Sequence, residues 1–326
     1  MNPIDAVLAV TYRCNARCAM CGIWRGKGGD GLPPETYRNL PASLRSVNIT
    51  GGEPFLRDDL VAVVETVHAA CPRAEVVIST NGLQTDRIVE SMRRLGGGKW
   101  LGLAVSLDGI GEMHDSIRGV PGAFAKAQET IRRLTEIGIG GLRLAFTASR
   151  ENTDHLPRVY DLSRQLGVEF TCAVAQGSDH YFQINGEGLG PAPEALKRAL
   201  EPVIRAELRS MSLKRWGRAY FMKGLYRLAA GEGRELPCYA GNAFFFADPA
   251  GEVYPCNMLC RVMGNLGEQP FDEMWNSPRA EKARQEARPC QGGCWMVCTA
   301  RTAMRRHKWR VLCWALRRKL SSKPAL

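Results

Sequence analysis

Short runs rich in β-branched residues alternate with helical segments through the first half of this chain, and this alternation restricts its fold most strongly. The runs expected to form buried strands are residues 7–11, 47–50, 75–80, 101–107, 142–147 and 168–173. Helical spacing is found between them, at residues 60–70, 86–95, 124–137 and 155–166. Such alternation implies parallel strands joined by right-handed crossovers. We therefore predict an α/β fold, a partial (β/α)6 TIM-like barrel with its functional groups at the carboxyl ends of the strands.

The pattern changes after residue 176, which indicates further units beyond the barrel. A long polar stretch leads into two helical segments, then into a region rich in cysteine and glycine, and finally into a basic segment. The predicted parts are a barrel core at 1–176, a helical linker at 177–236, a C-terminal cysteine-rich extension at 237–299, and a basic amphipathic helix or tail at 300–326.

The basic charge is concentrated at the C-terminal end of the sequence. The net charge is +11 over 326 residues, and the segment 300–326 has nine cations and no acid: Arg301, Arg305, Arg306, Lys308, Arg310, Arg317, Arg318, Lys319 and Lys323. Because the remainder is nearly balanced, no nucleic-acid partner is expected. A helix with Trp309 and Trp314 among these cations could instead contact an anionic membrane, dock a partner, or remain a solvated tail.

The cysteines are expected to bind metal. The sequence has 12 of them, no signal-peptide pattern at its start, and no apolar run of the roughly 18 residues that a spanning helix needs. We therefore predict a cytoplasmic protein, where grouped cysteines are typical metal ligands and disulfides are rare.

Cys14, Cys18 and Cys21 directly follow the first expected strand. Three thiolates cannot complete a structural zinc site, which takes four ligands. They can bind three irons of a [4Fe–4S] cluster and leave the fourth iron open to a substrate or cofactor. A chance grouping, or a zinc site completed elsewhere in the chain, is the alternative.

The CX3CX2C spacing, with Met20 before the last cysteine, resembles the signature of radical S-adenosylmethionine (SAM) enzymes. The resemblance implies that the open iron of the cluster binds SAM through its amino and carboxylate groups. It also implies that an electron, from a partner such as flavodoxin or ferredoxin, cleaves SAM to a 5′-deoxyadenosyl radical, which removes a hydrogen atom from the substrate.

Three further segments resemble the SAM-binding parts of this family. Gly51, Gly52 and Glu53 match its GGE segment, and Glu53 or the neighbouring carbonyls would accept hydrogen bonds from the methionine ammonium. Ser79 and Asn81 end the third strand and suit ribose or carboxylate binding. By the resemblance, Ser106 and Arg118 would contact the SAM carboxylate, although a simple turn and a surface arginine remain alternatives. His114 is expected to be structural.

A second group of cysteines lies beyond residue 237. The CX12GX4C segment from Cys238 to Cys256 and the CQGGC segment from Cys290 to Cys294 resemble the SPASM and twitch extensions of the same family. The resemblance implies one auxiliary [4Fe–4S] cluster, held by Cys238, Cys256 and two of Cys290, Cys294 and Cys298. A second cluster, or a zinc site, is the alternative. Residues 244–256 are expected to form a hairpin around the turn Asp248-Pro249-Ala250-Gly251.

The reaction type is less constrained than the family. The expected function is SAM cleavage followed by dehydrogenation or epimerisation of a small sugar-like or lipid-linked substrate. Cys260 is a candidate hydrogen donor for epimerisation, with a buried or cluster-binding role as the alternative. Asn257 stands where sulfatase-maturing relatives carry an acidic base, and an amide cannot take up a proton at neutral pH. A peptide- or lipid-modifying enzyme that forms a new C–C or C–S bond, or a non-catalytic iron–sulfur protein, remains an alternative.

Overall fold

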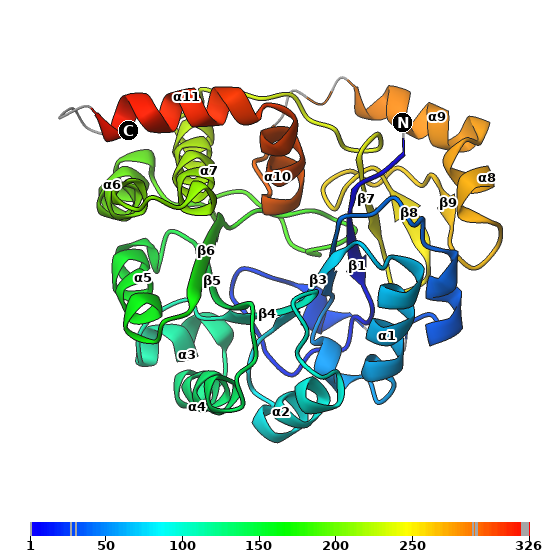
Figure 1. The fold of residues 1–326 in the computed structure, drawn as a ribbon, viewed down its shortest axis with the longest axis horizontal. Coiled ribbons are helices and arrows are strands. Elements are labelled where there is room, and N and C mark those ends of the chain that lie inside the picture. The colour runs from blue at the N-terminus through cyan, green and yellow to red at the C-terminus, as the bar shows by residue number, and fades with distance from the viewer. Residues whose placement is uncertain (1, 27, 30, 289, 291–292, 321–325) are drawn as a thin grey trace.

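A continuous nine-stranded sheet forms the centre of the molecule, in the order β6-β5-β4-β3-β2-β1-β7-β8-β9 (Figure 1). The computed structural model describes all residues except 1, 27, 30, 289, 291–292 and 321–325. Strands β1 to β6 are parallel and comprise Asp5–Ala9, Ser46–Thr50, Glu75–Thr80, Leu101–Ser106, Leu142–Ala148 and Glu169–Val174. The six expected strands are therefore confirmed, and with them the partial barrel.

Helices cover the outer face of this barrel (Figure 1). They are α1 (Leu60–Ala70), α2 (Thr85–Arg94), α3 (Glu112–Arg118), α4 (Ala123–Glu136) and α5 (Leu156–Gln165). Short 3-10 turns lie at Ile23–Arg25, Pro34–Asn39, Pro54–Leu56 and Thr153–His155. Alternate strand residues such as Leu8 and Ile49 pack in the same buried core as Val63 and Val67 of α1. Their neighbours along β1, Val7 and Ala9, belong to a second buried cluster, so this strand is covered on both faces.

The cysteine-rich extension is joined to the barrel by the sheet itself. Strand β7 (Phe244–Ala247) pairs in parallel with β1, with Asp5 opposite Phe244. It continues antiparallel into β8 (Glu252–Tyr254) and β9 (Gly264–Asn265). The expected hairpin turn is confirmed: Gly251 has φ 87°, and the Asp248 carboxylate accepts from the Glu252 N–H at 2.9 Å. Helices α8 (Phe271–Trp275) and α9 (Pro278–Ala287) follow beside this hairpin.

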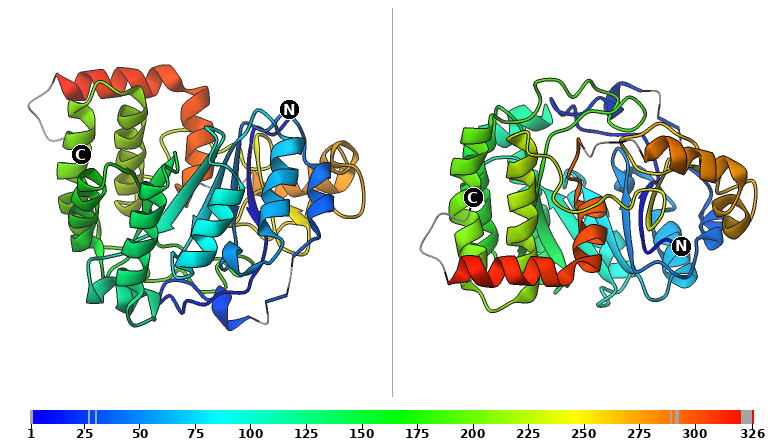
Figure 2. Two further views of the ribbon diagram at one scale, coloured as in Figure 1. Left: turned by 60° about the horizontal axis from the view of Figure 1, so that its bottom comes forward. Right: turned by 90° about the horizontal axis from the view of Figure 1, so that it is seen from above.

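Four helices lie beside β6, where the six-stranded barrel remains open (Figures 1 and 2). They are α6 (Pro193–Arg209), α7 (Leu213–Ala229), α10 (Val297–Arg306) and α11 (Lys308–Lys319). The basic segment is helical as expected up to Lys319, with a break at His307 between α10 and α11. Helix α10 is fixed to the start of β1, where the buried Asp5 carboxylate accepts from Arg301 Nε at 3.0 Å and from the Thr302 hydroxyl. In the described part of the chain, no helix combines the length and hydrophobicity needed to cross a membrane.

Candidate functional site

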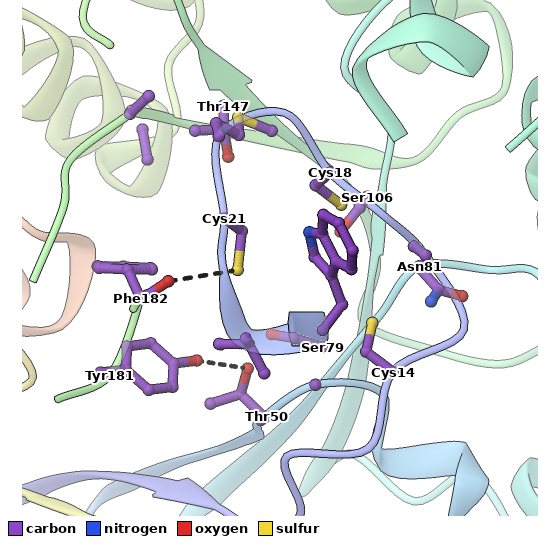
Figure 3. A pocket seen from close by; sticks show the side chains of 18 of the residues that line it. Cys14, Cys18, Cys21, Thr50, Ser79, Asn81, Ser106, Thr147, Tyr181 and Phe182 are labelled. Carbon is purple, nitrogen blue, oxygen red and sulfur yellow. Dashed lines mark hydrogen bonds between the residues drawn. The ribbon is translucent and has the colours of Figure 1, made fainter. Parts of the chain in front are cut away.

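The loop after β1 places three thiols on the wall of one cavity (Figure 3). Cys14, Cys18 and Cys21 line this space, whose volume is about 270 Å³. The carboxyl-terminal ends of β2 to β6 supply much of the remaining wall. This is the position that the barrel topology predicts for functional groups.

The three-cysteine loop is fixed by backbone hydrogen bonds to distant segments. Arg17 N–H donates to the Arg118 carbonyl at 2.8 Å, and Ala19 N–H donates to the Ile117 carbonyl at 2.9 Å. Gly22 N–H donates to the Phe182 carbonyl at 2.8 Å. A Cβ at Gly22 would lie 2.0 Å from the Gln183 carbonyl oxygen, so a glycine is required for this close approach.

The pKa values of these thiols indicate which kind of ligand they can bind. Burial raises the pKa of Cys14 to about 12 and that of Cys21 to about 11, and the neighbouring Cys18 charge adds to both shifts. Such thiols become thiolates only beside a positive partner such as iron. Within the described ranges, no three His, Cys, Asp or Glu side chains converge on a point suited to a single metal ion. Three thiols facing a shared cavity fit a multi-iron cluster that spans the space between them.

The GGE segment suggested either the Glu53 side chain or the neighbouring carbonyls as the acceptor for the SAM ammonium. The structure argues against the side chain, because Glu53 is not among the residues that line the cavity. Its carboxylate is fully buried and accepts from Phe55 N–H at 3.2 Å, the Thr80 hydroxyl at 2.9 Å and Asn81 N–H at 2.7 Å. Burial nevertheless raises the pKa of Glu53 to about 7. Gly51 and Gly52 do line the cavity. The Glu53 side chain thus ties β2 to β3, while Gly51 and Gly52 face the cavity.

The other polar residues expected at the strand ends are brought together. Ser79, Asn81 and Ser106 all line the cavity, and so does Met20. Ser79 Oγ donates to Asn48 Oδ1 at 3.1 Å. Asn81 Nδ2 donates to Asn15 Oδ1 at 2.7 Å, so this amide also holds the cysteine loop in place.

Arg118 links the cysteine loop to the interior of the barrel. Its Nη1 donates to Cys18 Sγ at 3.6 Å, and its Nη2 forms an ion pair with the buried Asp108. Asp108 Oδ1 also accepts from Thr147 N–H at 2.7 Å. His114 is structural as expected, because its Nδ1 accepts from Asp108 N–H at 2.9 Å and burial lowers its pKa to about 3.

Several cavity residues were missed in the sequence. Tyr181 and Phe182 come from the polar stretch expected to be a linker, and Met296 comes from the cysteine-rich extension. The Tyr181 hydroxyl lies 3.3 Å from that of Thr50, and the Cys21 thiol approaches the Phe182 carbonyl at 4.0 Å (Figure 3). The sequence signal that could have indicated their role is that Tyr181 and Phe182 are adjacent aromatic residues inside an otherwise polar stretch.

Four of the later cysteines influence one another electrostatically. Burial raises the pKa of Cys256 to about 12, with added contributions from Cys294 and Cys238. Burial likewise raises the pKa of Cys294, with Cys238 and Cys290 adding to the shift against the effect of Arg234. Cys238, Cys256, Cys290 and Cys294 therefore form one neighbourhood of thiols that suits an auxiliary cluster. Gln291 and Gly292 of the CQGGC segment lie outside the described residues.

Cys298 also lies near this group, because burial raises its pKa to about 12 and Cys294 adds to the shift. Cys298 is buried on α10 and packs in the same cluster as Cys256 and Tyr181, with Cys21 packed against it. Cys260 is exposed and is not among the residues that line the three-cysteine cavity. Cys71 and Cys172 are buried in the hydrophobic core. Asn257 is buried beside Ser178, whose hydroxyl donates to its carbonyl at 3.0 Å.

Comparison with known proteins identifies both parts of the chain. The family model of the radical SAM superfamily matches residues 8–162, and that of the SPASM iron–sulfur cluster-binding domain matches residues 238–299. The AdoMet-dependent heme synthase of Methanosarcina barkeri is 27% identical over 87% of this chain and 85% of its own length. The Fe-coproporphyrin III synthase of the same organism is 33% identical over 82% of this chain and 72% of its own length.

Solved structures show the same fold. The structure of Streptococcus suis SuiB bound to SAM matches with a TM-score of 0.66 at 16% identity, over 86% of this chain and 68% of that one. The cofactors of the family, a [4Fe–4S] cluster, SAM and an auxiliary cluster, agree with the two groups of thiols described above. The chain is thus a member of the radical SAM superfamily that carries a SPASM domain.

Proposed function

We propose that this protein oxidises an organic substrate and that its two sets of cysteines hold two iron–sulfur clusters. In this proposal Cys14, Cys18 and Cys21 hold the cluster that binds SAM. Cys238, Cys256, Cys290 and Cys294 hold the auxiliary cluster. In the same proposal SAM lies against residues that all line the cavity: Met20, Gly51, Gly52, Ser79, Asn81, Ser106 and Arg118.

This assignment gives each predicted part of the chain a role. Residues 1–176 form the reaction chamber, 177–236 the helical connection that also supplies Tyr181, 237–299 the auxiliary cluster domain, and 300–326 the basic helices. When bound, the cofactors supply a 5′-deoxyadenosyl radical that removes a hydrogen atom, and a second cluster able to accept one electron. The residues of the chain bind and orient these groups and exclude water.

The thiols near the cavity favour oxidation over epimerisation. An epimerase needs a hydrogen donor at the substrate, and a free thiol is the expected one. In the described part of the chain, the cysteines that line the cavity are Cys14, Cys18 and Cys21, which are assigned to the cluster. Cys260 is exposed outside that wall. A substrate radical that finds no hydrogen donor is resolved by losing an electron and a proton.

The packing around Tyr181 is the observation that carries this proposal. Tyr181 lines the cavity, and its phenol is close enough to Cys21, Cys298 and Cys14 for their charges to raise its pKa, after the larger effect of burial. Tyr181 and Cys256 belong to one buried cluster, which Cys21 contacts. The SPASM segment also sends Met296 into the cavity wall. One proposed auxiliary ligand, Cys256, therefore shares a buried cluster with a residue of the cavity wall, which supports electron transfer from the substrate to the auxiliary cluster.

The proposed substrate is a carboxylate-bearing tetrapyrrole. Two relatives that cover most of this chain are named as a heme synthase and an Fe-coproporphyrin III synthase. The cavity offers apolar and aromatic surface from Ile23, Trp24 and Phe182 opposite its polar strand ends, which suits a flat ring system. This class replaces the sugar-like substrate expected from the sequence as our leading proposal.

The test uses anaerobically reconstituted protein supplied with SAM and a reductant. Formation of 5′-deoxyadenosine by the wild type, and its loss in Cys14→Ala, is expected. Fe-coproporphyrin III is then added in deuterated water. A product that has lost hydrogen and carries no solvent deuterium at the reacting carbon supports oxidation, whereas deuterium incorporation without a change in unsaturation would show epimerisation. A parallel incubation with a peptide substrate tests the alternative, since modification of the peptide would support a peptide-modifying enzyme.

The proposed reducing partner, a flavodoxin or ferredoxin, has a cationic surface available to it. Arg17 and Arg25 flank a hollow on the cysteine loop that Cys14 and Trp24 also line. Acidic electron carriers dock on such surfaces with a rate that depends on salt. Removing both cations should slow SAM cleavage driven by flavodoxin and leave cleavage driven by dithionite unchanged. Equal slowing with both reductants would reject this docking site.

A further inference from the structure

Helix α11 exposes a stripe of apolar side chains. Trp309 is 68% exposed, Leu316 is 42% exposed, and Leu320, at the end of the helix, is 87% exposed. Cys313 is also exposed. These positions follow a spacing of four, three and four residues and therefore lie on one side of the helix. Val311 and Ala315 are buried on its other side.

The exposed apolar residues of the rest of the described chain gather near this stripe. Met211 is 79% exposed and Leu213 is 68% exposed, in the turn before α7 and at its start. Lys319 Nζ lies 3.3 Å from Met211 Sδ and donates to the Ser210 carbonyl at 3.0 Å, which places this turn beside the end of α11. Val297, at the start of α10, completes the set of large exposed apolar side chains among the described residues. Scattered exposed apolar residues need no explanation, but a gathered set marks an interaction site.

A groove continues this surface between α7, α10 and α11. Its volume is about 570 Å³, and Leu213, Val297 and Trp309 lie on its lining. Deeper lining is supplied by Trp216, Phe221, Met304 and Leu312. The exposed stripe and the groove meet at Trp309, and we call the two together the α11 face.

Cations outnumber acids around the α11 face, where Glu75 and Glu169 also line the groove and Glu169 pairs with Lys214. Arg306, Lys308, Arg310 and Arg317 are exposed along α10 and α11, and the whole segment 300–326 contains no acid. Lys214 borders the groove next to Leu213. An apolar stripe flanked by Lys and Arg, with a tryptophan at its edge, has the chemistry that fits the interface of an anionic bilayer.

We propose that the α11 face lies on the surface of anionic lipid bilayers. Trp309, Leu316 and Leu320 enter the headgroup region, and the flanking cations meet lipid phosphates. The groove between α7, α10 and α11 accepts part of an acyl chain. This inference is independent of the reaction proposed above.

The position of this face also bears on how substrate enters. The groove is lined by Glu75, Arg143 and Glu169, which lie at or near the amino ends of β3, β5 and β6. The three-cysteine cavity is lined by Thr80, Thr147 and Val174, which lie at or near the carboxyl ends of the same strands. A bilayer at the α11 face therefore lies at the opposite end of the barrel from the cavity. Membrane contact would locate the enzyme and would not deliver a lipid-linked substrate into the cavity.

The test is co-sedimentation of the reconstituted holoenzyme with vesicles. We expect the wild type to bind vesicles of phosphatidylglycerol and phosphatidylcholine at least tenfold more tightly than vesicles of phosphatidylcholine alone. The variant Trp309→Ser, Leu316→Ser, Leu320→Ser should bind anionic vesicles at least tenfold more weakly than the wild type. Its circular dichroism and iron content should be unchanged, since these side chains are exposed.

Two charge variants distinguish vesicle binding through the α11 face from non-specific attraction by the net positive charge of the protein. Arg306→Gln, Arg310→Gln, Arg317→Gln removes three cations from the α11 face. Arg93→Gln, Arg94→Gln, Arg158→Gln removes three exposed cations from α2 and α5. The two variants have the same net charge, and only the first should lose vesicle binding.

Three results would overturn the proposal. The first is a wild type that remains in the supernatant with anionic vesicles, and the second is an equal loss of binding in both charge variants. The third is a dimer in sedimentation velocity that the serine variant dissociates, without any vesicle binding. That last result would assign the α11 face to a second copy of this chain.

Discussion

Asp108 and Arg118 form a buried ion pair directly behind the three-cysteine loop. Arg118 also donates to Cys18 Sγ at 3.6 Å, and Asp108 accepts from Thr147 N–H on β5. The carboxylate therefore determines where the guanidinium points. An arginine held in this way presents its charge to the cluster loop and to an anionic ligand in the cavity.

Asp108→Asn should destabilise the protein and weaken SAM binding. Removing one partner of a buried pair leaves an uncompensated charge, which costs about 3–5 kcal/mol. The control is Asp86→Asn, because Asp86 pairs with Arg133 at the surface and such exposed pairs contribute about 0–1 kcal/mol. Chemical denaturation measures the free energy of unfolding, and equilibrium dialysis measures SAM affinity. Equal effects of the two substitutions would contradict the proposed role of Asp108.

Glu53 should make stability depend on pH in the neutral range. Burial raises its pKa from 4.5 to about 7 in the folded protein, so the folded state favours the protonated form. The resulting stability is fully present below pH 4.5 and is lost as the pH rises through about 7. The free energy of unfolding of the wild type, relative to Glu53→Gln, should therefore fall between pH 5 and pH 7.

The measurement for Glu53 is urea denaturation at several pH values across this range. Glu90→Gln, on the exposed face of α2, is the matched control and should follow the wild-type pH profile. A difference between wild type and Glu53→Gln that does not vary with pH would show that Glu53 is ionised throughout.

Gly22→Ala should prevent the cysteine loop from closing. The added Cβ would lie 2.0 Å from the Gln183 carbonyl oxygen, and both partners of that contact are backbone. We expect at least a tenfold loss of 5′-deoxyadenosine formation, together with loss of the iron bound at this loop. Gly29→Ala, where a Cβ would meet nothing within 4 Å, is the control and should behave like the wild type. Normal iron content and activity in Gly22→Ala would mean that the loop tolerates a different path.

Alanine variants of the later cysteines should differ in the amount of iron that they bind. Cys256→Ala and Cys294→Ala should each remove about four irons per chain, since each would lose one auxiliary [4Fe–4S] cluster. Cys298→Ala should retain them, because Cys238, Cys256, Cys290 and Cys294 already supply the four thiolates of the proposed cluster. Iron analysis and electron paramagnetic resonance of the reduced proteins provide the measurement. Loss of the same irons in Cys298→Ala would place this residue among the ligands.

The strand order of the barrel and many cavity residues could be predicted because local patterns determine them. The run ending at Thr50 and the small polar residues at Ser79 and Ser106 carry their positions in the sequence, since parallel strands end at one edge. The role of Glu53 could not be predicted. Whether its carboxylate faces a ligand or the ends of β2 and β3 depends on contacts with Thr80 and Asn81, which are distant in the sequence.

Other features depend on contacts across most of the chain. Tyr181 reaches the cavity only because its loop passes over β2, where it meets Thr50. The break between α10 and α11 at His307 lies within a pattern that is helical on both sides. The Asp5 carboxylate at the start of β1 fixes α10, and no local signal links these two segments.

The parallel pairing of β1 with β7 has a consequence for biosynthesis. β1 leaves the ribosome before the other strands of the barrel, whereas Phe244–Ala247 follows only after all of them have been made. At about 5–20 residues per second, the outer edge of β1 waits on the order of ten seconds or more for its partner. An unpaired edge is a template for pairing with the wrong chain. The nascent protein should therefore depend most on chaperones until Phe244–Ala247 has been translated.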